Sequence, residues 1–156
     1  MTGVIPLEEI INNIKEMGYV TVEPKGEIKP SFYKLKDRTV LKVLININHL
    51  VADPRSPQGF TVNSNNTSIC YVAKEDRHPE MYRPFTASEI QSNIDDEDME
   101  PETLREDFSV YSLSNGMTLS VKAVVAQVSK TKFFTADGEP LYMVNTTPVI
   151  KVKKNP

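Results

Sequence analysis

The densest group of chemically versatile side chains in the sequence is an acidic run, Asp95-Asp96-Glu97-Asp98. Carboxylate oxygens are the ligands that hard cations such as Mg²⁺ and Ca²⁺ prefer. Asp95, Asp96 and Asp98 are therefore weak candidates for a metal site. Their spacing differs from that of an EF-hand loop, in which the ligands alternate, a glycine lies at the centre and a glutamate ends the loop. We predict neither a dedicated metal site nor a cofactor.

Few other residues suggest catalysis. His78 lies in a polar, acidic segment, and a histidine beside carboxylates can act as a general base. No nucleophile or oxyanion donor accompanies it in the sequence. Cys70 lies in an apolar predicted strand, where a buried and unreactive thiol is expected. The sequence therefore favours a protein without an active site, and a metal-dependent enzyme using His78 is the weakest of three functional hypotheses.

Basic and aromatic side chains occur together in two segments that are predicted to be strands. Lysines beside aromatic rings can follow the phosphates and stack on the bases of single-stranded nucleic acid. Lysine on an exposed strand is also an ordinary protection against edge pairing. RNA or single-stranded DNA is therefore an alternative partner rather than the favoured one. The candidate binding residues are Lys34, Lys36, Arg38, Lys42, Arg55, Lys132 and Phe133.

The elements that must position these residues occur twice along the chain. Residues 31–43 (SFYKLKDRTVLKV) and 109–121 (SVYSLSNGMTLSV) are identical at five of 13 positions, which include Tyr33 and Tyr111. Weaker matches lie on both sides of this segment and keep the same order. We therefore predict a tandem duplication of a helix-plus-hairpin unit, with repeat units at 7–74 and 87–154.

Each unit carries local signals for a helix followed by short strands. Apolar residues recur at helical spacing from Leu7 to Met17, and Gly18 then suits a helix end. Asn115-Gly116 is a strong signal for a two-residue hairpin turn, whereas Arg38 in the matching position predicts a wider turn. We expect further strands at 19–23, 59–64, 68–73, 141–146 and 148–153, with His49 on the same face as Ile45 and Ile47. The predicted fold is mainly β with short helices (α+β), as a small barrel or two half-barrels.

Charge is unevenly distributed along the chain. Residues 75–107 include 12 acidic and three basic side chains, whereas the whole chain has a formal net charge of only -3. Thr86 or Ser88 suits the cap of a short helix there, and Pro101 suits the first turn of another. We therefore divide the chain into a first β repeat with an N-terminal helix (1–74), an acidic connector with short helices (75–107) and the strands of the second repeat (108–156).

Composition indicates a modest folded core in a reducing compartment. A single cysteine excludes an intramolecular disulfide, and no apolar run approaches the roughly 20 residues of a membrane-spanning helix. No secretory signal pattern is visible, so we expect a cytoplasmic protein without membrane contact. The duplicated architecture, the missing catalytic pattern and the two regions of opposite charge favour a non-enzymatic protein-binding or assembly module. Such a module would be a subunit of a larger complex or would self-associate.

Overall fold

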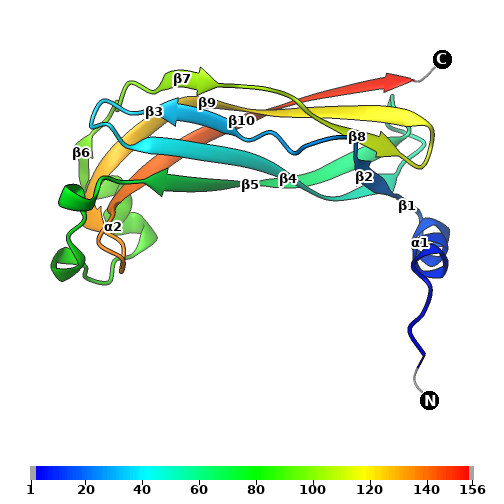
Figure 1. Ribbon diagram of the computed structural model, residues 1–156, viewed down its shortest axis with the longest axis horizontal. Coiled ribbons are helices and arrows are strands. Elements are labelled where there is room, and N and C mark those ends of the chain that lie inside the picture. Colours follow the sequence, from blue (N-terminus) through cyan, green and yellow to red (C-terminus); the bar gives the residue numbers. More distant parts are fainter. Residues whose placement is uncertain (1–2, 155–156) are drawn as a thin grey trace.

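The protein is mainly β, and its strands form two antiparallel five-stranded sheets (Figure 1). The computed structural model describes residues 3–154. In the first sheet, the central strand β4 (Val40–Ala52) pairs along one side with β5 (Phe60–Tyr71). Its other side pairs with β3 (Ser31–Lys34) and β1 (Tyr19–Val20), and β7 (Glu102–Arg105) continues the sheet from β3.

The second sheet has the same plan around the central strand β9 (Met117–Phe134). One side of β9 pairs with β10 (Pro140–Lys154), and the other side pairs with β8 (Ser109–Leu113) and β6 (Ile94–Asp96). The strand β2 (Val22–Pro24) pairs with β8. Strand β2 from the first half of the chain therefore belongs to the second sheet, and β7 from the second half belongs to the first sheet. Each sheet is completed by a strand from the other half.

The helices lie at the two ends of the molecule (Figure 1). Helix α1 (Leu7–Glu16) projects from one end. At the other end, η1 (Lys74–Asp76), η2 (Pro79–Met81) and α2 (Ala87–Ser92) form a group that we call the end lobe. No helix in the described chain is long and apolar enough to cross a membrane.

Two parts of the acidic segment 75–107 are strands of the sheets, β6 and β7, in addition to its short helices. Thr86 does cap α2, in a capping box in which Thr86 Oγ1 accepts from the Glu89 backbone N–H at 3.3 Å and Glu89 Oε1 accepts from the Thr86 N–H at 3.2 Å. The helix expected after Pro101 is wrong, because residues 102–105 form β7 and pair with β3. Pairing with a distant strand outweighs the local preference of proline for a first helical turn.

The two halves of the chain repeat the same order of elements, a helix, two short strands and three longer ones. The central hairpins also share their register, because Tyr33 faces Leu41 in the first and Tyr111 faces Leu119 in the second. These parallels follow the sequence match. Equivalent hairpins can also arise from shared turn chemistry, so the common origin of the two halves stays a prediction.

The turns of these two hairpins have the same conformation. Arg38 has φ 73° and Gly116 has φ 86°, and in both turns the preceding side chain, Asp37 or Asn115, accepts a hydrogen bond from the N–H two positions on. Each hairpin closes over three residues, 36–38 and 114–116, so the wider turn expected at Arg38 is confirmed and the two-residue turn expected at Asn115-Gly116 is wrong. Holding a residue with a Cβ in this left-handed region lowers the stability of the fold by about 1 kcal/mol or more, and glycine at position 116 avoids this cost.

The core lies between the two sheets and is made by alternate residues of the long strands. Leu41 and Val43 on β4 and Leu119 and Val121 on β9 are buried, with more exposed residues between them. The other buried apolar side chains are Tyr33, Leu35, Ile45, Leu50, Phe60, Met99, Tyr111, Leu113, Ala123, Val128 and Phe133.

Several strands differ from their predicted bounds. The two strands expected at 59–64 and 68–73 are one continuous strand, β5, and those expected at 141–146 and 148–153 are one strand, β10. Pro148 is tolerated within β10 because that strand lies at the edge of its sheet, where a missing N–H donor breaks no ladder. A register shift between Ile47 and His49 leaves His49 exposed against Tyr19, with ring centroids 5.5 Å apart, so its expected place on the inner face is wrong.

Candidate functional site

Several of the predicted site residues meet at the end of the molecule that carries the end lobe. The turn between β3 and β4 brings Lys36 and Arg38 there, β9 brings Lys132, and the segment around β6 brings Asp95 and Asp96. A cavity of about 610 Å³ opens at this end. We call it the polar cavity, and its lining includes Asp37, Arg38, Asp76, His78, Asp95, Lys130 and Lys132.

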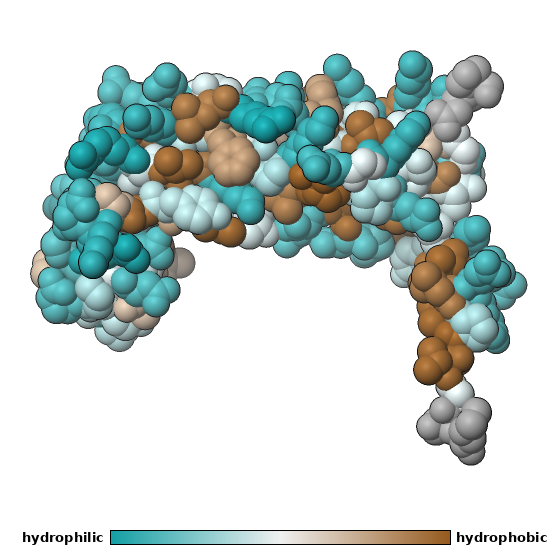
Figure 2. Space-filling model, in the orientation of Figure 1, coloured by the Kyte–Doolittle hydropathy of each residue, from teal (hydrophilic) through white to brown (hydrophobic). Residues whose placement is uncertain are grey.

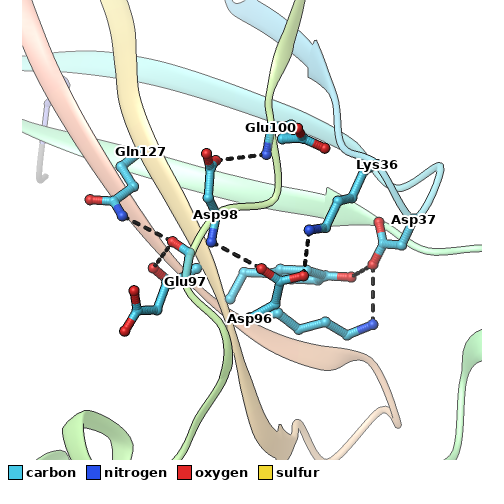
Figure 3. A network of polar contacts seen from close by, with 10 residues as sticks. Lys36, Asp37, Asp96, Glu97, Asp98, Glu100 and Gln127 are labelled. Carbon is cyan, nitrogen blue, oxygen red and sulfur yellow. Dashed lines mark hydrogen bonds and ion pairs between the residues drawn. The ribbon is translucent and has the colours of Figure 1, made fainter.

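Two carboxylates of the acidic run, those of Asp96 and Asp98, accept hydrogen bonds from nearby backbone N–H groups beside this cavity (Figure 3). Lys36 Nζ lies 2.6 Å from Asp96 Oδ2, and the Asp98 N–H donates to Asp96 Oδ1 at 3.1 Å. Asp98 Oδ1 in turn accepts from the Glu100 N–H at 2.8 Å. The hydrogen bond from Lys36 is the main reason that the pKa of Asp96 lies below its usual value. Among residues 3–154, no three His, Cys, Asp or Glu side chains come together to hold a metal ion.

A second polar cluster joins the two sheets at Asp37. Its carboxylate accepts a short hydrogen bond from the Tyr142 hydroxyl, one from the Thr39 N–H at 3.1 Å and one from Lys130 Nζ at 3.3 Å. Burial alone would raise the pKa of Asp37, but these donors lower it below its usual value. Burial and the neighbouring carboxylate raise the pKa of Tyr142. Asp37 therefore ties the β3–β4 turn to β9 and β10.

Acid is expected to remove the stabilising contribution of Asp37. Asp37→Asn should lower the free energy of unfolding near neutral pH by about 1 kcal/mol, because hydrogen bonds to an ionised acceptor are the stronger ones. The pKa of Asp37 is lower in the folded protein than its unfolded value of about 3.9, so this contribution is present above about pH 4 and is lost as the pH falls through the folded pKa. Urea unfolding of both proteins near neutrality and below about pH 3 measures this, and a difference that stays constant with pH would contradict it.

The remaining predicted residues lie apart from the polar cavity or are covered. Arg55 lies in the loop between β4 and β5 at the opposite end, with its side chain 92% exposed. Lys34 and Lys42 lie on paired strands of the first sheet. Phe133 is only 2% exposed and packs against Phe85, with ring centroids 5.1 Å apart, so its ring is not free to stack on a base.

Sequence reasoning did not select Asp37 or Tyr142 as site residues. They lie 105 positions apart in the chain, and neither stands in a recognisable motif. Cys70 was expected to be unreactive, and burial raises the pKa of its thiol to about 12. The thiol therefore stays protonated at neutral pH, and Cys70 is partly buried where full burial was expected.

A different kind of surface lies at the other end of the molecule, on α1. The helix has no buried residue, and Leu7 and Met17 are 68% and 72% exposed. Val4 and Ile5, just before the helix, are exposed as well. Figure 2 shows these apolar side chains as a continuous stripe along the projecting segment. We call this stripe the α1 apolar face, formed by Val4, Ile5, Leu7, Ile10, Ile14 and Met17.

The α1 apolar face was visible in the sequence as a helical period, but its exposure was not. An amphipathic helix normally buries its apolar side against the protein core. Here Ile11 and Ile14 line a small pocket with Val20 and Val22, while Leu7 and Met17 remain largely exposed. The polar side carries Glu8, Glu9 and Glu16 and a single lysine, Lys15.

Comparisons with models of protein families, with curated proteins and with solved structures found no match to the chain. The interpretation of both surfaces therefore rests on their own geometry and chemistry.

Proposed function

We propose that the protein is a non-enzymatic protein-binding module, and a subunit of a larger complex, that holds its partner on the α1 apolar face. The observation that carries this proposal is the exposure of Leu7 and Met17 on a helix that projects from the body. Burying one large aliphatic side chain stabilises an interface by about 1.5–3 kcal/mol. Leaving the α1 apolar face exposed to water is therefore costly unless a partner covers it.

The charges beside the stripe indicate the chemistry of the partner. Helix α1 has three acidic residues and one basic residue, so its polar side is negative. Amphipathic helices bind grooves whose floor is apolar and whose rim carries the opposite charge. The partner is expected to be a protein with an apolar groove bordered by lysine or arginine.

The test replaces single residues on either side of the helix. Leu7→Glu should weaken partner binding at least about tenfold, because a charge replaces an anchor of the apolar face. Leu7 is exposed, so the fold should be unchanged. Asn12→Glu, at the centre of the polar side of the same helix, is the matched control and should bind at least as tightly as the wild type does. The measurement is quantitative co-purification with the full-length tagged protein, with cross-linking to map the contact to α1.

Two results would contradict the proposal. One is a partner that Leu7→Glu and Met17→Glu both retain in full. The other is a loss of binding that is equal for Leu7→Glu and Asn12→Glu, because a contact specific to the apolar face must distinguish the two faces of the helix.

A further inference from the structure

The edge strands of the two sheets differ in how they are protected from pairing with other chains. Natural sheets protect exposed edges with charged side chains, proline or very short strands. Strand β10 has Pro140, Pro148 and three lysines near its end. Strands β7 (ETLR), β2 (VEP) and β6 (IDD) are short, and each contains charged residues or proline. The remaining long edge, β5, has none of these features.

Strand β5 reads FTVNSNNTSICY, 12 residues without a charged side chain or a proline. It pairs with β4 from Phe60 to Tyr71, and its other backbone edge has no partner strand among residues 3–154. The edge lies open between α1 and the end lobe (Figure 1). A row of free backbone donors and acceptors of this length is a template for another strand.

We propose that β5 pairs in antiparallel fashion with β5 of a second copy of the chain, which joins the two first sheets into one continuous sheet. A two-fold pairing places each strand against itself, so the strand must be complementary to its own sequence. Strand β5 meets this requirement because no like charges would face each other across the axis. The two prolines of β10 lack the backbone donors that such a pairing would use, which disfavours that edge.

The side chains of β5 support the choice of a second copy as the occupant. The centre of the strand is Asn, Ser and Thr, whose side chains provide both donors and acceptors. They already pair sideways with β4, since Asn46 donates to Thr67 at 2.7 Å and Asn48 donates to Asn63 at 3.0 Å. A second β5 would continue this polar ladder, and Asn65, which is exposed between these pairs, would lie at or next to the axis.

This pairing goes beyond the proposed function, because it uses a different surface from the α1 apolar face. The first experiment is size-exclusion chromatography with light scattering on the full chain. We expect a mass twice the 17.6 kDa of the single chain. Asn65→Lys should halve that mass, because two ammonium groups would meet near the axis. Asn145→Lys, an exposed residue on the protected edge strand β10, is the matched control and should leave the mass doubled.

A cysteine scan keeps the proposal testable if Asn65→Lys fails to fold. In the Cys70→Ser background, cysteines are introduced singly at Ser64, Asn65 and Asn66. Only the residue on a two-fold axis faces its own counterpart, so one of the three positions should form a disulfide-linked dimer on mild oxidation, in preference to its neighbours. Equal cross-linking at all three positions would overturn the pairing.

A wild-type mass of a single chain at all concentrations would also overturn the proposal, and capture of an extended peptide by that monomer would assign the edge to a different protein. The outcome is independent of the proposed function, because Leu7→Glu should leave the doubled mass unchanged. A Leu7→Glu chain that loses its α1 partner and stays dimeric would show that the two surfaces bind independently of each other.

Discussion

Gly138→Ala is expected to lower the free energy of unfolding by about 3 kcal/mol and to loosen the end lobe. Gly138 has φ +87°, a conformation that residues with a Cβ rarely adopt. An added Cβ would also lie 2.3 Å from the backbone nitrogen of Pro79 and 2.7 Å from the carbonyl carbon of His78. Both neighbouring atoms belong to the main chain, so no flexible side chain can move away to make room.

Gly138 also connects the end lobe to the β9–β10 turn by a backbone hydrogen bond. The His78 N–H donates to the Gly138 carbonyl at 2.7 Å, and a displaced turn would lose this contact. Urea unfolding gives the stability change, and amide hydrogen exchange of residues 74–92 reports the loosening of the end lobe.

Gly116→Ala is the matched control for this prediction. Gly116 has φ +86°, but an added Cβ would meet no atom within 4 Å. Its replacement should therefore cost only about 1 kcal/mol, which is the conformational part of the effect. Equal losses at Gly116 and Gly138 would show that the contact with Pro79 contributes nothing.

Tyr33→Phe is expected to lower the free energy of unfolding by about 2 kcal/mol, because it removes a hydroxyl that joins the two sheets. Tyr33 lies on β3 and is 2% exposed. Its hydroxyl donates to Glu106 Oε2 at 2.6 Å and accepts from the Val125 N–H on β9 at 3.1 Å. Burial and the Glu106 carboxylate raise the pKa of Tyr33 to about 12. Phenylalanine would leave the carboxylate and the N–H without this partner, and unsatisfied buried groups are costly.

Tyr111 provides a control from the equivalent position in the other half of the chain. It is nearly as buried as Tyr33, and burial alone raises the pKa of Tyr111. The structure shows no hydrogen bond from its hydroxyl to any of residues 3–154. Tyr111→Phe should therefore change stability by less than about 0.5 kcal/mol, and thermal or urea unfolding of both variants measures the difference. A loss at Tyr111 as large as that at Tyr33 would contradict the role of the Tyr33 hydroxyl.

The sequence by itself determined the features that depend on neighbouring residues. The helical period of α1, its end before Gly18 and the Thr86 cap of α2 were predicted and are confirmed. The hairpin turn at Asn115-Gly116 was located correctly, but it spans three residues instead of two. The mainly β class and the shared hairpin register also follow from local patterns, because alternation and turn residues act over a few positions.

The tertiary structure alone decided how these elements combine. Strands β2 and β7 were placed in sheets of the opposite half, and residues after Pro101 became a strand because β3 offered them an edge. The Asp37–Tyr142 contact and the burial of Phe133 arose in the same way, from segments far apart in the chain. The physical reason is that strand partners and buried neighbours are chosen by packing over long range, and the local pattern of a short strand does not specify them. The exposure of the α1 apolar face is decided at that level as well, since the sequence shows that a helix has an apolar side but not what covers it.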